Sequence, residues 1–205
     1  MLFKKIDYYK IPETVVVIRN WYTDEELLQV WEELNFICDP KYLQNEEQTK
    51  SAFDETNTYI KKGHGLFLDN LYEDRMHSVI LQLNAKIFNP DLLNALIGLD
   101  PNFTHLKNCT KDSTLVNYYE DKHEYKKHYD NTVFTCCTPL WKEPKQFDGG
   151  VFLITEDDID LKINSNDMII FPGYIKHQVT PITMVDGYAP WKSGRYSIAN
   201  FINYN

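Results

Sequence analysis

Apolar residues recur at helical spacing in the first half of the chain and at shorter, strand-like spacing in the second half. Residues 14–19 read TVVVIR, a β-branched run that predicts a short strand. A threonine and a glutamate three positions apart then form a capping box, and the apolar positions after them predict a helix over 23–36. The same spacing predicts a second amphipathic helix over 70–88 and a shorter one over 90–96.

A polar segment separates this helical half from a β-rich half. Residues 39–66 have no clear period and predict a long loop, of the kind that serves as a lid or a binding loop. After residue 113, short β-rich runs alternate with turn residues. The runs are STLVNYY, TVFTCCTPLW, GGVFLIT, DIDLKI, DMIIFP, HQVTPI and RYSIANFINY. Seven closely spaced strands with no helix between them predict an antiparallel barrel or jelly roll, with the helices packed outside it.

The length fits one domain that is mostly β with flanking helices, in the α+β class. Residues 1–112 would form a strand and a helical buttress, and residues 113–205 would form the catalytic core. The sequence does not determine the oligomeric state.

Composition and charge narrow the possible partners. The chain is 43% hydrophobic and 14% aromatic, which is typical of a globular protein. Its net charge of −9 is spread along the chain and argues against a nucleic-acid partner. The four cysteines lack C-x-x-C spacing, and no apolar run is long enough for a signal peptide or a membrane span. We therefore expect a soluble cytoplasmic protein with reduced thiols and no membrane partner.

The stretch YEDKHEYKKHYDN contains two of the six histidines. In a strand, residues i and i+2 share a face, so His128 and Asp130 can both enter a barrel interior while Tyr129 points outward. His123 has a tyrosine at i+2 and is expected in solvent. An imidazole and a carboxylate on one face are two of the three ligands of a 2-His-1-carboxylate iron site. A lone H-x-D is weak evidence, because such pairs arise by chance and usually lie on the surface.

The third ligand must come from elsewhere in the fold. His177 opens HQVTPI after a strand-like run, and barrel closure can bring it next to Asp130. Arg195 begins the last β-rich run and is one of only three arginines. A guanidinium buried in a barrel wall needs an anionic partner, and a dicarboxylate cosubstrate would provide one through a bidentate pair.

Five elements in order give this chain a family resemblance. H-x-D, D-G-G, D-M-I-I-F-P, H-x-V-x-P-I and G-x-R-x-S resemble the Fe(II)- and 2-oxoglutarate-dependent oxygenases, and among them the prolyl 4-hydroxylase-like branch. The match runs from about residue 115 to 201, under half of the chain. The resemblance implies a double-stranded β-helix, a cupin-like jelly roll, that hydroxylates an amino-acid side chain. A peptidyl proline is the favoured substrate.

The resemblance also implies residue roles and cofactors. His128, Asp130 and His177 would be the iron ligands, and Arg195 would pair with the far carboxylate of 2-oxoglutarate. Iron, 2-oxoglutarate and O₂ would be needed, with ascorbate supporting activity. The partner would be a peptide or protein substrate.

Two tyrosines and one departure complete the comparison with the family. The resemblance places Tyr118, ten residues before His128, against the cosubstrate and Tyr125 near the metal, although any strand tyrosine more often serves packing. His177 and Arg195 are 18 positions apart, against about ten in the family. An insertion around MVDGYAPW would explain the longer gap, and a shifted register of the last strand would turn Arg195 outward.

Three alternatives stay open at this stage. The substrate could be a free amino acid or another small molecule instead of a peptide. Oxidative demethylation of nucleic-acid bases is disfavoured by the acidic charge and by Phe201, which stands where those enzymes carry a further arginine. A non-catalytic jelly-roll binding module would keep the scaffold without the reaction.

Overall fold

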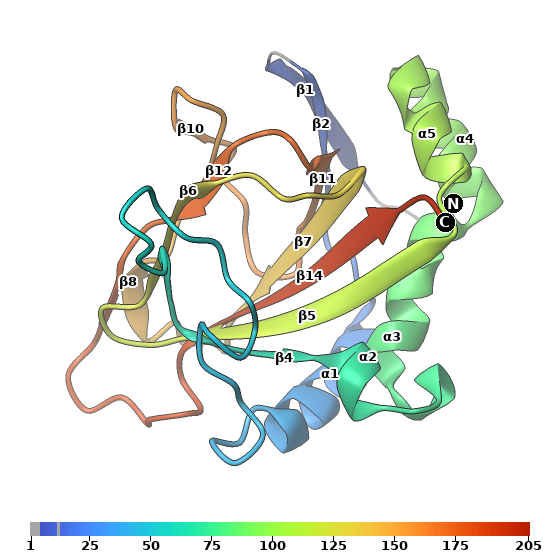
Figure 1. The fold of residues 1–205 in the computed structure, drawn as a ribbon. Coiled ribbons are helices and arrows are strands. Elements are labelled where there is room, and N and C mark those ends of the chain that lie inside the picture. The colour runs from blue at the N-terminus through green and yellow to red at the C-terminus, as the bar shows by residue number, and fades with distance from the viewer. Residues whose placement is uncertain (1–4, 12) are drawn as a thin grey trace.

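The computed structural model describes residues 5–11 and 13–205, and it forms a β-barrel with helices along one side (Figure 1). All strand pairs in it are antiparallel. The larger sheet has the order β1 (Ile6–Ile11), β2 (Glu13–Ile18), β11 (Met168–Pro172), β7 (Phe134–Leu140), β14 (Arg195–Asn203), β5 (Lys111–Tyr119) and β4 (His64–Phe67). The smaller sheet has the order β10 (Ile159–Asp160), β9 (Phe152–Ile154), β12 (His177–Val179), β6 (Glu124–His128) and β3 (Lys61–Lys62). A separate ribbon pairs β13 (Ile182–Met184) with β8 (Phe147–Gly149).

The helical elements gather on the outer side of the larger sheet (Figure 1). They are α1 (Asp24–Ile37), α2 (Leu68–Leu71), η1 (Arg75–His77), α3 (Val79–Asn84), η2 (Ala85–Phe88), α4 (Pro90–Leu99), η3 (Pro101–Phe103) and α5 (Thr104–Lys107). The predicted capping box begins α1, because Thr23 accepts from the Glu26 amide and Glu26 accepts from the Thr23 amide. Among the described residues, no helix is both long and apolar enough to cross a membrane.

The strand period sorts the side chains of the larger sheet into two layers. On β14, Tyr196 and Ile198 face the helices and join the core formed with Leu34 and Leu96. Ala199 lies on the opposite face, in a second apolar cluster inside the barrel. Burying each leucine or isoleucine of the helix-facing core contributes about 1.5–3 kcal/mol, so the helical layer holds the larger sheet in place as one wall of the barrel.

The structure corrects several predicted elements. The segment 70–88 is not one helix: Asp74 caps η1, and Ser78, in an extended conformation, caps a new helix by accepting from the Leu81 amide. The predicted 39–66 loop runs into β3 and β4. Strand β1 was not predicted, because IDYYKI lacks a β-branched run, and β6 lies ahead of the strand expected over HYD, because EYKKH lacks an apolar run.

The N-terminal part supplies sheet as well as helices. Strand β2 pairs with β11, and β4 pairs with β5, so residues before 113 extend both edges of the larger sheet. The division into 1–112 and 113–205 stays a prediction. The mostly β class and the double-stranded β-helix are confirmed.

Candidate metal centre

Two neighbouring strands of the smaller sheet carry the two histidines. His128 ends β6, His177 begins β12, and the two residues are direct partners in the ladder. Asp130 lies two residues beyond the end of β6, where its amide donates to the Gly173 carbonyl at 2.8 Å. The predicted strand over HYD is therefore wrong, but the facing is as expected, since Tyr129 is 62% exposed.

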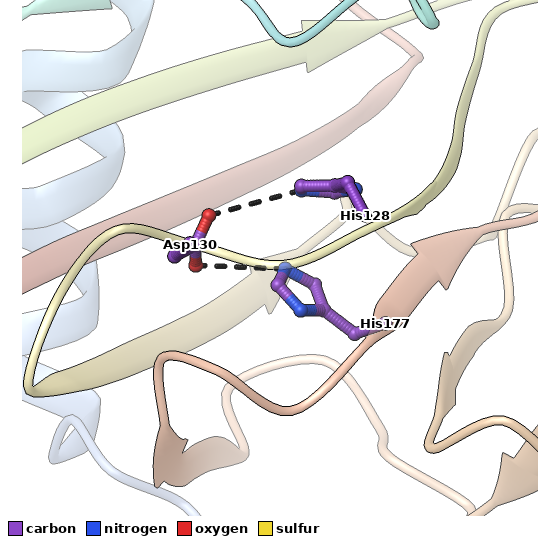
Figure 2. Close-up of side chains that lie close together, drawn as sticks. All are labelled: His128, Asp130 and His177. Atoms are coloured by element: carbon purple, nitrogen blue, oxygen red, sulfur yellow. Dashed lines mark ion pairs between the residues drawn. The ribbon is translucent and has the colours of Figure 1, made fainter. Parts of the chain in front are cut away.

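The three side chains converge inside the barrel (Figure 2). His128 Nε2 lies 3.8 Å from Asp130 Oδ1, and His177 Nε2 lies 3.6 Å from Asp130 Oδ2. One donor atom from each residue falls within 4.8 Å of the other two. The structure thus brings together the three residues that the sequence singles out, from positions up to 49 residues apart.

Each of the three side chains is held by a further hydrogen bond. His128 Nδ1 lies 2.8 Å from the Lys126 carbonyl, and His177 Nδ1 lies 3.0 Å from the Ile175 carbonyl. A carbonyl can only accept, so Nδ1 carries the proton in both rings and Nε2 keeps its lone pair toward the cluster. Thr135 Oγ1 donates to Asp130 Oδ2 at 2.6 Å and fixes the carboxylate.

Burial keeps the two histidines in the neutral form that binds a metal. It lowers the pKa of His128 to about 4, with the neighbouring His177 as a further cause. Burial also lowers the pKa of His177 to about 4. It raises the pKa of Asp130, while the Thr135 hydrogen bond lowers it. At neutral pH both imidazoles are therefore neutral ligands.

The metal-free protein should lose stability as the pH falls. Both histidines titrate near 6.5 when unfolded and near 4 when folded, so between these values the unfolded chain binds more protons. Their contribution is fully present above pH 6.5 and is lost as the pH falls toward 4. We expect urea unfolding of the apoprotein to give a free energy roughly 2–4 kcal/mol lower at pH 5 than at pH 7.5. Equal values for the wild type, or an unchanged slope in the double variant H128N/H177N, would contradict this explanation.

A cavity of about 300 Å³ opens beside the cluster. Tyr125 lines it and stacks on His128, with ring centroids 3.7 Å apart, so this predicted residue does lie at the site. The segment 49–52 lines it too, which places part of the expected 39–66 loop over the cavity. Residues 182–193, which contain the MVDGYAPW segment of the proposed insertion, are absent from the lining.

Tyr118 does not lie where the resemblance placed it. Its hydroxyl donates to Glu120 Oε1 at 2.8 Å and accepts from the Gly194 amide, on the helix-facing side of β5. Tyr119 lines the cavity instead. Counting ten residues back from His128 ignores the strand period, whereas alternation with the cavity-lining Asn117 would have selected Tyr119.

His123 is also not in solvent as expected. Its ring is half-buried, and Nδ1 accepts from the Glu120 amide at 3.0 Å. The ring packs edge-on against His64, with centroids 5.3 Å apart. His123 lies in the turn after β5 and His64 begins β4, so the pair is separate from the three-residue cluster.

Arg195 points into the barrel in spite of the long gap after His177. It pairs with Tyr119 across the β14–β5 ladder and is 1% exposed. Its Nε and Nη1 atoms have no hydrogen-bond partner among the described residues. Its guanidinium carbon lies 5.8 Å from the centre of the Tyr119 ring. Arg195 borders a second cavity of about 170 Å³, and Phe152 lines both cavities.

Gly150 sets the position of the Arg195 side chain. Gly150 has φ +64°, and a Cβ there would lie 2.9 Å from Arg195 Cδ. We expect Gly150→Ala to cost roughly 1–2 kcal/mol in unfolding free energy from the left-handed backbone. It should also weaken 2-oxoglutarate binding by displacing Arg195.

Gly187→Ala is the matched control for this variant. Gly187 has φ +76°, and a Cβ there would meet nothing within 4 Å, so it shares the backbone strain without the contact. Calorimetric titration with 2-oxoglutarate should show weaker binding for Gly150→Ala alone. Equal affinity in both variants would mean that Gly150 serves only the turn.

The donor set fits one class of metal. Two neutral imidazoles and one carboxylate on one side leave the opposite coordination positions open, which is the arrangement of non-haem Fe(II) oxygenases. The unpartnered, buried Arg195 guanidinium fits a carboxylate ligand of the same interior.

Comparison with known proteins shows which family the barrel sequence resembles. Residues 114–203 match the family model of the 2OG-Fe(II) oxygenase superfamily. These residues are thus similar to that superfamily, over under half of the chain. The predicted resemblance is therefore confirmed, and the cofactors that the superfamily's name gives, Fe(II) and 2-oxoglutarate, are the ones that the sequence predicts.

Curated relatives of the chain carry hydroxylase names. A PKHD-type hydroxylase from Delftia acidovorans is 33% identical over 88 residues, covering 36% of this chain and 38% of the relative. A PKHD-type hydroxylase from Acinetobacter baumannii is 31% identical over 139 residues, 60% of this chain and 56% of the relative. The chain thus aligns with little more than half of these relatives at most.

A solved structure supports the fold over almost the whole chain. A Pseudomonas putida prolyl-4-hydroxylase superposes with a TM-score of 0.57 at 13% identity, covering 93% of this chain and 92% of that chain. At this identity the likeness concerns the fold, including the N-terminal half that the family model leaves out.

Proposed function

We propose that the protein is an Fe(II)- and 2-oxoglutarate-dependent dioxygenase that hydroxylates an amino-acid side chain, with peptidyl proline as the first substrate to test. The main support for this proposal is the geometry of His128, Asp130 and His177, which line one cavity and whose donor atoms lie within 4.8 Å of one another. The names of the relatives, PKHD-type hydroxylase and prolyl-4-hydroxylase, support the same reaction.

The chain's own residues would position the reactants and exclude water. The two histidines and Asp130 would hold the iron, with Thr135 keeping the carboxylate oriented. Arg195 would pair with the far carboxylate of 2-oxoglutarate, close to Tyr119. The bound iron and cosubstrate supply the oxidising chemistry that inserts an oxygen atom into a C–H bond. The apolar walls, among them Phe152 and Val179, would keep this chemistry dry.

The test is cosubstrate turnover by the iron-loaded protein. With ascorbate and a panel of proline-containing peptides, 2-oxoglutarate should be consumed and succinate released. A hydroxylated peptide gains one oxygen atom, which mass spectrometry detects. Absence of both cosubstrate turnover and peptide oxidation in iron-loaded protein would refute the proposal.

A further inference from the structure

A second buried cation, Lys61, lies in the cavity with the three-residue cluster. Its side chain is on β3, it is 1% exposed, and it lines the cavity. Its ammonium has no hydrogen-bond partner among the described residues. A buried charge without a partner is costly, so it indicates a ligand that the protein is built to receive.

The local structure is shaped around this ammonium. Lys61 reaches from the edge strand of the smaller sheet to β4, the edge strand of the larger sheet. There a Cβ on Gly65 would lie 3.1 Å from Lys61 Nζ, so the missing side chain leaves the room that the ammonium occupies. The adjacent Lys62 takes the opposite face of β3, is exposed, and pairs with Glu124. Only one of the two lysines is therefore directed inward.

No acidic group of the described residues neutralises Lys61. Glu46 is the one carboxylate that raises its pKa, but Glu46 accepts from the Gly63 amide and forms no ion pair with Lys61. Burial is the larger effect and lowers the pKa of Lys61 to about 8, so the amine is still mainly protonated at neutral pH. Lys61 also lowers the pKa of His128, which places its charge close to the cluster.

The charges of the interior leave room for one more anion. A divalent iron and a doubly charged 2-oxoglutarate cancel each other. Of the protein groups, Asp130 is negative, whereas Arg195 and Lys61 are positive and approach from different sheets. One positive charge is left over. Arg195, with its planar fork and its contact with Tyr119, suits the cosubstrate carboxylate, which leaves Lys61 for the substrate.

A second buried polar atom without a partner among the described residues, Asn117 Oδ1, indicates another group of the substrate. Asn117 Oδ1 is buried without a partner among the described residues in the same cavity, and Asn117 pairs with Gly65 across the β4–β5 ladder. A carbonyl oxygen accepts from an N–H group. The Lys61 ammonium can bind a carboxylate, and the Asn117 side-chain carbonyl can accept from an N–H group. An α-amino acid carries both of these groups.

We propose that Lys61 binds the carboxylate of the substrate, and that the substrate is an amino acid presented with a free carboxylate and an N–H group. This inference rests on the proposed dioxygenase function and narrows its substrate. The carboxylate could belong to a free amino acid or to the C-terminal residue of a peptide. An internal peptidyl residue would not use Lys61 in this way.

The test measures binding without turnover. Protein loaded with Mn(II) and 2-oxoglutarate under argon is titrated with L-amino acids, N-acetyl amino acids and peptides, each as the carboxylate and as the primary amide. We expect at least one carboxylate series to bind ~10-fold or more tightly than its amides. Free amino acids and C-terminal peptides form separate arms, so the tightest series shows the source of the carboxylate.

Lys61→Met should remove this preference, with a loss of at least ~30-fold in carboxylate affinity. Lys61→Gln is the second variant, in case methionine disturbs folding. Lys62→Met, the same change on the exposed face of β3, should keep the preference. Thermal unfolding of the ligand-free Lys61→Met protein should occur at the same or a higher temperature, because an unpaired buried charge is lost.

Three results would overturn the inference. The first is equal affinity for carboxylates and amides in the wild type. The second is a fall in melting temperature in both Lys61 variants, which would make Lys61 structural. The third is a loss of 2-oxoglutarate affinity in Lys61→Met at least as large as in Arg195→Met, which would make Lys61 the cosubstrate anchor. Failure of the dioxygenase proposal itself would instead appear as absent 2-oxoglutarate turnover in iron-loaded wild type.

Discussion

Replacing His128, Asp130 or His177 by alanine is expected to abolish iron binding and 2-oxoglutarate turnover together. Each residue supplies one donor atom to the cluster, in which the histidine Nε2 atoms lie 3.8 and 3.6 Å from the Asp130 carboxylate oxygens. Loss of a group that merely orients a ligand costs 10–100-fold in metal affinity, so loss of a ligand should cost at least ~100-fold. Metal content after dialysis and cosubstrate consumption measure the two effects.

The matched control for these variants is His123→Ala. His123 is half-buried and five residues from His128, but its ring contacts Glu120 and His64 instead of the cluster. The His123→Ala protein should therefore bind iron as tightly as the wild type does. Iron binding that survives in His128→Ala and Asp130→Ala would show that the cluster is structural and would favour the non-catalytic binding module.

Arg195→Met is expected to raise the KM for 2-oxoglutarate by roughly 30–5,000-fold, because truncating one partner of a buried charge pair costs about 2–5 kcal/mol. The guanidinium is 1% exposed, and its Nε and Nη1 atoms are unpartnered among the described residues. Without cosubstrate the variant should be at least as stable as the wild type, since the unpaired charge is gone. A lysine at this position keeps the positive charge but lacks the planar, bidentate guanidinium, so the KM of Arg195→Lys for 2-oxoglutarate should lie between those of the wild type and Arg195→Met. Steady-state kinetics and thermal unfolding of the apoprotein provide the measurements.

Arg75→Met controls for removal of an arginine in general. Arg75 is 41% exposed and pairs with Asp69 and Asp112 away from the cavity. It should leave the KM for 2-oxoglutarate unchanged. A wild-type KM in Arg195→Met would remove Arg195 from the cosubstrate site.

The three-residue cluster could be predicted from the sequence because it depends on a short motif and on the order of motifs along the chain. H-x-D fixes two side chains through backbone geometry over three residues, and the order of motifs along a barrel fixes which strands meet. His177 was therefore predictable although 47 residues separate it from Asp130. The inward direction of Arg195 was not, since it depends on whether β13 and the turn after it absorb the longer gap without shifting β14.

The residues that were missed depend on long-range packing. Tyr118 and Tyr119 are adjacent on β5 and point to opposite faces of the sheet. Which of them faces the cavity depends on the pairing of β5 with β14, in which Tyr119 lies opposite Arg195. Lys61 stands in KKGHG, a polar sequence that reads as exposed, and it is buried only because a two-residue edge strand pairs with β6. The broken helix over 70–88 reflects side-chain caps at Asp74 and Ser78 that outweigh a continuous apolar period.

The split lining of the cavity has a consequence for engineering. The family model covers 114–203, which includes the three-residue cluster and Arg195, whereas Lys61 and the segment 49–52 lie before it and still line the cavity. The reaction centre and one of its walls are thus encoded in separate stretches of the gene. A chimera that exchanges residues 44–67 with those of another barrel should alter which molecules are accepted while the oxidising machinery stays intact.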